Sequence, residues 1–219
     1  TGGGGTLRIL EPAGGTEVAA LQVGGVVGGL RFSRDGRRMV VLPQQGGGQP
    51  SLWDLEGRAR VGDLGGHATA PFDGRFDQAG ERFVTAAGDG IVRIYDARTG
   101  AALGVLTGSP QFVLSAAFDP SGAVVAATGG DGAVRFWDSE AGDLLWALDA
   151  HRVPGADVRF ASDERLVTRD WEGALHVWRL DRRAIDVGEL DRLLPCRSPV
   201  RFDHSRQTLV EATRPAWCP

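Results

Sequence analysis

The sequence contains no lysine, because arginine supplies all 24 of its basic residues. So strict a preference indicates a GC-rich, bacterial coding sequence. It does not indicate a nucleic-acid-binding surface, since 28 acidic residues are interspersed with the arginines. The formal net charge of −4 gives the chain no general electrostatic attraction for nucleic acid. We therefore expect no nucleic-acid partner.

Cysteines and long apolar runs are also scarce. Cys196 and Cys218 are too few for a disulfide framework, and we interpret them as ordinary thiols, with a single disulfide as the alternative. No apolar run approaches the roughly 18 residues that a membrane helix needs, and no signal peptide is evident. These features predict a cytoplasmic protein without a membrane partner, although the chain starts without Met and is expected to be a fragment.

Motifs for metal, phosphate or acyl chemistry are missing as well. None of the four histidines stands at short spacing from a cysteine or from another histidine. The glycine strings "TGGGG", "QQGGGQ" and "ATGGDG" lack the lysine and the following helix of a phosphate-binding loop. There is no GxSxG motif for a nucleophilic serine. We predict no catalytic residue, no metal and no cofactor.

Glycine, by contrast, is abundant, and the aromatic residues recur with a fixed period. Trp53, Tyr95, Trp137 and Trp178 are spaced by 42, 42 and 41 residues. A second series is spaced by 44, 42, 42 and 42 residues and consists of Phe32, Phe76, Phe118, Phe160 and Phe202. Two independent markers with one period indicate an internal repeat of about 42 residues.

Each repeat is divided into short apolar runs by turn residues. In the third repeat the runs are "QFVLSAAF", "AVVAAT", "AVRFWD" and "DLLWAL", and the turns between them are "DPSG", "GGDG" and "SEAG". Runs of this length between Gly, Asp, Pro and Ser clusters are typical of strands and leave no room for helices. Four strands in about 42 residues predict one blade of a β-propeller.

The repeats resemble the WD-repeat (WD40) β-propeller family. "LWD" at 52–54 and "FWD" at 136–138 carry the Trp-Asp signature, "IYD" at 94–96 is a tyrosine variant, and "VWR" at 177–179 keeps only the tryptophan. "GH" at 66–67 and "AH" at 150–151 each place a histidine nine residues before the periodic phenylalanine, as the family pattern requires. The resemblance implies an all-β propeller of four-stranded antiparallel blades.

The boundaries predict four complete WD-type repeats with half-blades at each end. We expect residues 1–219 to form a single domain, in which 182–219 is an atypical terminal segment. The strands expected at 6–10 and 16–21 could join those expected at 199–203 and 208–212 in one composite blade, which would close a ring of five blades. We favour the alternative, in which the chain is the C-terminal part of a larger propeller.

The resemblance also implies a hydrogen-bonded network of His, Ser or Thr, Asp and Trp within a blade. The second repeat matches it best, with His67, Thr85, Asp89 and Tyr95. The other repeats match in part: the third keeps Asp131 and Trp137, and the fourth keeps His151, Thr168 and Trp178 but has Glu172 in place of Asp. A hydrolase triad is the alternative for this set, but its recurrence in two repeats favours a structural network.

The stretch "TRDWEG" at 168–173 differs most from the other repeats. It places Arg169, Asp170 and Trp171 where the other repeats have small residues. In the family this turn lies on the partner-binding side, and Trp and Arg are enriched in interface hot spots. Gln111 and Arg152 in neighbouring loops are further candidates. The alternative is that Trp171 only covers the edge of a blade.

We therefore predict a non-catalytic scaffold for protein–protein interaction. It would be the C-terminal WD-repeat platform of a larger bacterial regulatory or signalling protein, fused to an upstream effector domain or to further blades. The alternative is a ligand-binding or enzymatic propeller that uses its central channel. Arg31, Arg75, Arg159 and Arg201 directly precede the periodic phenylalanines, and Arg75 and Arg159 with Asp157 either line an anion site or are exposed to solvent.

Overall fold

The computed structural model describes residues 5–11, 13–44, 47–180, 201–203 and 208–210. Every regular element in these residues is a β-strand, and each strand pairs antiparallel with its neighbours. No helix in the described part of the chain is long and apolar enough to cross a membrane. The all-β class predicted from the alternating apolar runs is confirmed.

The strands form successive four-stranded sheets, each corresponding to one predicted repeat. Blade 1 consists of β3 (Val27–Phe32), β4 (Arg38–Pro43), β5 (Ser51–Asp54) and β6 (Ala59–Asp63). Blade 2 consists of β7 (Pro71–Phe76), β8 (Arg82–Ala87), β9 (Val92–Asp96) and β10 (Ala102–Leu106). Blade 3 consists of β11 (Val113–Phe118), β12 (Val124–Gly129), β13 (Ala133–Asp138) and β14 (Leu144–Asp149). In each blade the strands are hydrogen-bonded in chain order.

The fourth repeat is described as a three-stranded sheet, blade 4. It consists of β15 (Gly155–Ser162), β16 (Arg165–Asp170) and β17 (Leu175–Arg179). The strand expected to complete this repeat falls after Leu180, outside the described residues. The predicted four-stranded antiparallel blades are thus found in full in three repeats.

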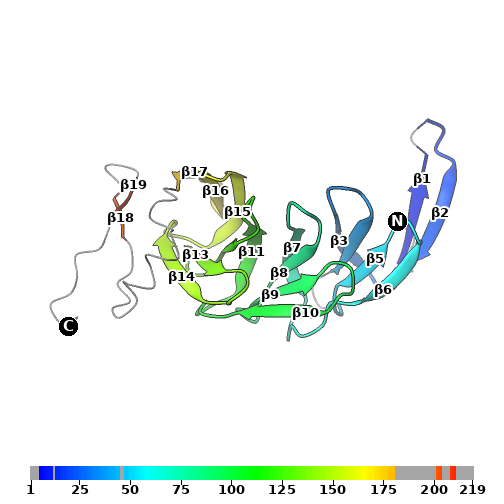
Figure 1. Ribbon diagram of the computed structural model, residues 1–219, viewed down its shortest axis with the longest axis horizontal. Coiled ribbons are helices and arrows are strands. Elements are labelled where there is room, and N and C mark those ends of the chain that lie inside the picture. The colour runs from blue at the N-terminus through cyan, green and yellow to red at the C-terminus, as the bar shows by residue number, and fades with distance from the viewer. Residues whose placement is uncertain (1–4, 12, 45–46, 181–200, 204–207, 211–219) are drawn as a thin grey trace.

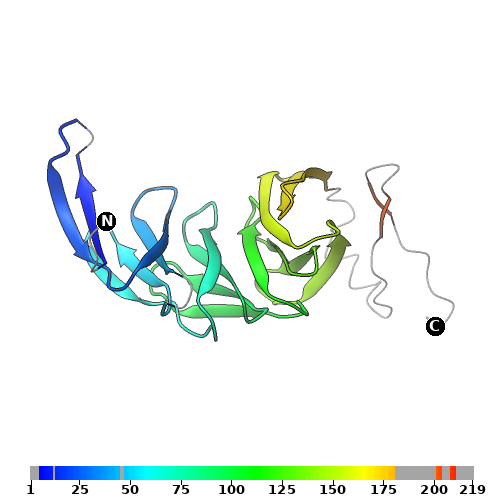
Figure 2. The same ribbon diagram turned by 180° about the vertical axis from the view of Figure 1, so that it is seen from behind.

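Two hairpins flank the blades. β1 (Thr6–Leu10) pairs with β2 (Glu17–Gln22), and β18 (Arg201–Asp203) pairs with β19 (Thr208–Val210). The two hairpins are separate sheets at opposite ends of an open arc (Figures 1 and 2), and the composite blade considered above stays a prediction. Most of the segment 182–219, including Cys196, Cys218 and His204, lies outside the described residues.

The hydrophobic core is divided into layers that lie between adjacent sheets. One layer contains Ile94 and Leu106 of blade 2 together with Phe118 and Trp137 of blade 3. The equivalent layers join blade 1 to blade 2, blade 3 to blade 4, and the β1–β2 hairpin to blade 1. Blades 1, 2 and 3 therefore each bury two faces against two neighbours, which is why the repeats carry the same apolar pattern.

The repeated "GDG" turn joins the second strand of a blade to the third. Gly90 and Gly132 adopt φ values of +77° and +75°, which glycine tolerates without strain. A Cβ atom at Gly132 would lie 2.4 Å from the carbonyl oxygen of His151. The turn of one blade is therefore in close contact with the loop that enters the next blade.

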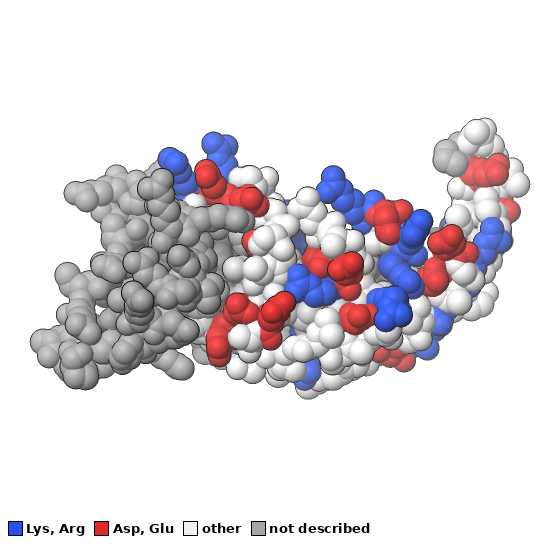
Figure 3. Space-filling view, viewed as in Figure 1, with Lys and Arg blue, Asp and Glu red and all other residues white. Residues whose placement is uncertain are grey.

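Charged residues of both signs are interspersed over the described part of the face in Figure 3. This mixed pattern matches the interspersed acids and arginines of the sequence. It differs from the single-sign surface typical of proteins that hold a nucleic-acid backbone.

Replacing Phe136 by alanine should test the layer between blades 3 and 4. The ring of Phe136 is fully buried and stacks on Trp146 with a centroid distance of 4.4 Å. Loss of such a ring typically costs about 3–5 kcal/mol, so we expect this decrease in the free energy of unfolding in a urea titration. Leu103→Ala, on the exposed outer strand β10, is the matched control and should change stability by only about 0.5 kcal/mol. Equal effects of the two substitutions would contradict the layered core.

Candidate partner-binding face and inner charged row

The structure brings three residues of the predicted blade 2 network together. Nδ1 of His67 lies 2.9 Å from Oδ2 of Asp89, and Nε2 lies 2.7 Å from Oγ1 of Thr85. The Asp89 carboxylate also accepts backbone N–H groups from Ala68 and Ile91, at 3.0 and 3.1 Å. Because a carboxylate can only accept, Nδ1 of His67 carries the proton and Nε2 accepts from the Thr85 hydroxyl. This set fixes the entering loop of blade 2 to its inner turn.

The aromatic residues of blades 2 and 3 donate hydrogen bonds to the loops that enter their own blades. The Tyr95 hydroxyl donates to the carbonyl of Gly65 at 3.0 Å. Nε1 of Trp137 donates to the carbonyl of Thr107 at 2.7 Å, and both pairs are 30 residues apart in sequence. In these blades the aromatic side chain thus anchors the loop that enters its own blade.

Blade 3 lacks the network histidine, and its Asp131 pairs with an arginine instead. Its carboxylate accepts from Nη1 and Nη2 of Arg135 at 3.1 and 2.5 Å, and from the backbone N–H of Ala133 at 3.2 Å. Burial alone would raise the pKa of Asp131, but the bond and charge of Arg135 outweigh burial and lower it. Asp131 is therefore ionised and paired, which suits a structural role.

Blade 4 completes its network with Asp170 rather than with the position of Glu172. Oγ1 of Thr168 lies 2.8 Å from Nε2 of His151 and accepts from Nε1 of Trp178, also at 2.8 Å. Oδ2 of Asp170 lies 3.4 Å from Nδ1 of His151, whereas Glu172 is exposed. Asp170, predicted to lie on the partner-binding face, is instead buried, because strand alternation points it inward at the end of β16.

Both network histidines are neutral at pH 7. Burial lowers the pKa of His67, and the hydrogen bond that its ring donates to Asp89 opposes this only in part. Burial likewise lowers the pKa of His151, and the neighbouring His176, whose ring centroid lies 4.9 Å away, lowers it further. A proton added to either ring would enter a buried site that is hydrogen-bonded for the neutral form.

The loops that enter the blades and the turns between second and third strands lie at the same end of the sheets. We call this end the loop face; it includes residues 64–70, 88–91, 107–112, 130–132, 150–154 and 171–174. Direct contacts show this: Gly130 N–H donates to the carbonyl of Phe112 at 2.9 Å, and Trp171 N–H donates to that of Pro154 at 3.0 Å. The loop face therefore combines segments from neighbouring blades.

An aromatic row crosses the loop face and consists of Phe72, Phe112 and Trp171. Phe72 and Phe112 meet edge to face with a centroid distance of 6.4 Å, and Trp171 stacks on Phe112 at 6.0 Å with an interplanar angle of 19°. Trp171 is 59% exposed and Phe72 is 39% exposed. Exposed aromatic side chains that are contiguous over three blades are uncommon on a surface without a ligand-binding role.

Three of the other predicted partner-binding residues are exposed. Gln111, adjacent to Phe112, is exposed, and so are Arg152 in the loop that enters blade 4 and Arg169 on β16. Only Asp170 of the predicted set is withdrawn from the surface. The structure therefore places four of the five candidates where a partner can reach them.

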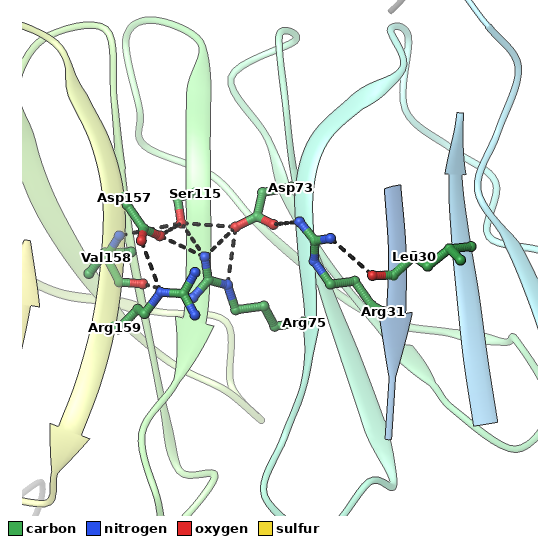
Figure 4. Close-up of polar contacts among 8 residues, drawn as sticks. All are labelled: Leu30, Arg31, Asp73, Arg75, Ser115, Asp157, Val158 and Arg159. Atoms are coloured by element: carbon green, nitrogen blue, oxygen red, sulfur yellow. Dashed lines mark hydrogen bonds and ion pairs between the residues drawn. The ribbon is translucent and has the colours of Figure 1, made fainter. Parts of the chain in front are cut away.

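A second polar cluster, the inner charged row, connects the first strands of the four blades (Figure 4). These strands, β3, β7, β11 and β15, lie side by side. The row consists of Arg31, Asp73, Arg75, Ser115, Asp157 and Arg159. Nη2 of Arg75 alone reaches Asp73 at 2.7 Å, Ser115 at 3.3 Å and Asp157 at 2.6 Å. One arginine of blade 2 thus ties blades 3 and 4 to its own blade.

The charges of the inner charged row stabilise one another. Burial alone would lower the pKa of Arg75, but the charges of Asp73 and Asp157 outweigh burial and raise it. Burial would raise the pKa of Asp157, but the hydrogen bond from Arg159 and the charge of Arg75 lower it. Arg75 and Asp157 are therefore both ionised at neutral pH.

A cavity of about 580 Å³ lies between blades 2 and 3, at the end of the sheets opposite the loop face. Arg82 in its wall uses all its nitrogens: Nε donates to Asp77 at 3.0 Å, Nη1 to Ser139 at 3.0 Å and Nη2 to the carbonyl of Gly122 at 2.6 Å. Its guanidinium also stacks over Phe118. This arrangement joins two blades and holds every nitrogen of the arginine against an oxygen of the protein.

Residues 100–138 match the family model of the WD domain, G-beta repeat. The chain contains a WD40 repeat. The matched segment begins just before β10 of blade 2 and ends with β13 of blade 3, so the WD40 sequence unit spans two neighbouring blades. No curated protein matches the chain at a significant level. WD40 repeats generally mediate protein–protein interaction, and WD40 domains are typically non-catalytic scaffolds that bind protein partners.

The sequence did not predict all members of the inner charged row and of the aromatic row. It named Arg75, Arg159 and Asp157 but not Asp73 or Ser115, although Asp73, Ser115 and Asp157 recur at intervals of 42 residues. The ring contacts that join Phe112 and Phe72 to Trp171 carried no periodic signal. Within the described residues no group of three or more His, Cys, Asp or Glu side chains could hold a metal ion.

Acidification should destabilise the WD40 domain through its buried histidines. The folded-state pKa of His67 and of His151 lies below the ordinary value of 6.5, so the unfolded chain takes up the proton first as the pH falls. We therefore expect the free energy of unfolding to decrease as the pH is lowered from about 7.5 to about 5.5. His67→Gln and His151→Gln should each make this dependence shallower. A stability that is constant or rises over this range would contradict the assignment.

Asp73→Asn should weaken the tie between the first strands. It removes the charge that pairs with Arg31 and Arg75, and leaves the guanidinium of Arg75, which is only 16% exposed, with less compensation. Breaking such a buried pair typically costs about 3 kcal/mol or more, and we expect this loss in urea unfolding. Asp149→Asn, at the exposed end of β14, is the control. Wild-type stability in Asp73→Asn would show that the row does not tie the blades together.

Proposed function

We propose that this chain is a non-catalytic platform that binds a protein partner on its loop face, with Trp171 as the central anchor. The platform is proposed to belong to a larger bacterial regulatory or signalling protein. The observation that carries the proposal is the aromatic row of Phe72, Phe112 and Trp171, which combines side chains from three blades in one exposed surface. The WD40 match supports it at the level of the family.

The anchor is held in position before a partner arrives. The backbone N–H of Trp171 donates to the carbonyl of Pro154, and its ring stacks on Phe112. Phe112 in turn lies over Gly130, where a Cβ atom would come within 2.9 Å of the ring. A side chain that is already ordered loses little conformational entropy when it binds, so its burial contributes more to affinity.

The surroundings of the row have the composition of an interface. An apolar centre is flanked by the exposed polar side chains of Gln111, Arg152 and Arg169. Interfaces usually combine a desolvated aromatic centre with a polar rim of this kind. Arginine and glutamine at the rim contribute orientation and specificity, whereas Trp171 contributes most of the buried area.

The alternative, catalysis in the central channel, has weaker support. Ser115 is the hydroxyl of the inner charged row, but it is buried, and it lies against the carboxylates of Asp73 and Asp157. A serine nucleophile is normally activated by a histidine and exposed to its substrate. Among the described residues no histidine contacts Ser115, so the geometry favours a structural role for it.

Trp171→Ala should abolish partner binding without unfolding the domain. Truncation of an interface tryptophan commonly costs about 2 kcal/mol or more, which corresponds to a loss of affinity of roughly thirtyfold. We expect proteins cross-linked to the wild-type chain in cells of its source to be lost from the Trp171→Ala chain, as counted by quantitative mass spectrometry.

Leu103→Ala provides the matched control, because Leu103 is also a large apolar side chain that is more than half exposed, but it lies on the outer strand β10. Its cross-linked proteins should be those of the wild type. Urea unfolding of both variants verifies that the fold is retained. The proposal fails if a folded Trp171→Ala chain keeps every partner, or if Leu103→Ala loses the same ones.

A further inference from the structure

The inner charged row alternates in charge and ends in arginine on both sides. Arg31 pairs with Asp73 at 2.7 Å, Arg75 pairs with both aspartates, and Arg159 pairs with Asp157 at 2.9 Å. Three guanidinium groups therefore share two carboxylates, and the row carries one uncompensated positive charge. The excess charge lies toward the ends of the row, because the carboxylates occupy its inner positions.

The Arg159 end is the more open of the two. The side chain of Arg159 is 64% exposed, compared with 37% for Arg31. Nε of Arg159 donates to Oδ2 of Asp157. Its two terminal nitrogens have no hydrogen-bond partner among the residues that the structure describes. Asp157 therefore orients the guanidinium while leaving its outer edge free to donate.

Arg75 converges on the same carboxylate. Nη2 of Arg75 donates to Oδ1 of Asp157, so the two oxygens of one carboxylate each bind a different arginine. Figure 4 shows the guanidinium groups of Arg75 and Arg159 on the same side of Asp157. Between their strands lies β11, whose Ser115 contacts both Arg75 and Asp157. Two guanidinium groups that share one carboxylate repel each other, and an additional anion would relieve the repulsion.

We propose that Arg159, together with Arg75, forms an oxyanion-binding site on the inner strands, which takes a carboxylate or phosphate group of a ligand. The planar guanidinium of Arg159 presents its terminal nitrogens in the fork geometry that suits two oxygens of such a group. Asp157 and Ser115 hold the site in position and do not themselves contact the anion. This site is separate from the loop face and does not depend on the partner proposed there.

The experiment is a titration of the ¹⁵N-labelled chain with inorganic phosphate, at constant ionic strength and followed by NMR. We expect a saturable shift of the Nε–Hε signal of Arg159, which is assigned by its loss in Arg159→Gln. A second titration with triglutamate tests the carboxylate form of the same chemistry, and it should compete with phosphate. Arg159→Gln should weaken binding by about tenfold or more, as followed on backbone amide signals near Asp157.

Matched variants decide the outcome. Arg165→Gln removes an exposed arginine from β16 of the same blade and should leave binding unchanged, whereas Arg159→Lys should bind with intermediate strength because it keeps the charge without the fork. Should Arg159→Gln disturb the fold, Arg159→Lys decides alone. Trp171→Ala should bind phosphate as the wild type does, even where it loses protein partners. A linear, unsaturable shift, or an equal loss in Arg165→Gln, would overturn the proposal.

Discussion

Face-to-face packing of neighbouring sheets is the constraint on which the rest of the structure depends. A four-stranded blade is too small to bury its apolar side chains alone, so blades 1, 2 and 3 each cover both faces with their neighbours. The layer between blades 2 and 3 illustrates this, because Ile94 from one and Trp137 from the other belong to one cluster. Since every layer solves the same packing problem, the sequence repeats, and the networks of His67 and His151 fix only the loops at the ends.

The inner strands impose a different requirement. They lie side by side where little apolar surface is available, and polar side chains connect them instead. The long reach of Arg75 depends on blade 3, in which Ser115 and Ala117 occupy the positions held by Asp157 and Arg159 in blade 4. Ser115 contacts both Arg75 and Asp157, so a larger residue at this position would stand between them. A small side chain in one blade thus permits an ion pair between residues 82 positions apart.

The sequence predicted the strands well because period and turns are local signals. The predicted strands at 6–10 and 16–21 match β1 and β2 within one residue at each end. Aligning the fourth repeat with Asp89 of the second places Glu172 in the network, whereas Asp170 is the carboxylate that lies beside His151. This difference could not be predicted from the alignment, because it depends on which side chain points inward at the end of β16. Asp73 was missed although it recurs with Ser115 and Asp157 at intervals of 42 residues, because the interval alone does not show which of these side chains meet in space. Contacts between distant strands, such as that of Arg75 with Asp157, cannot be recognised from a local sequence pattern.

The aromatic row shows how one surface can be built from positions that are not equivalent. In blade 3 the N–H of Gly130 donates to the carbonyl of Phe112, and in blade 4 the N–H of Trp171 donates in the same way to the carbonyl of Pro154. Pro154 is therefore equivalent to Phe112, and Trp171 is equivalent to Gly130. In blade 3 the aromatic ring comes from the entering loop and lies over a glycine. In blade 4 the loop carries no aromatic residue, and the turn supplies Trp171, which reaches back to Phe112. The row remains continuous although its members come from different strands, and this continuity is the feature on which the proposed partner-binding surface depends.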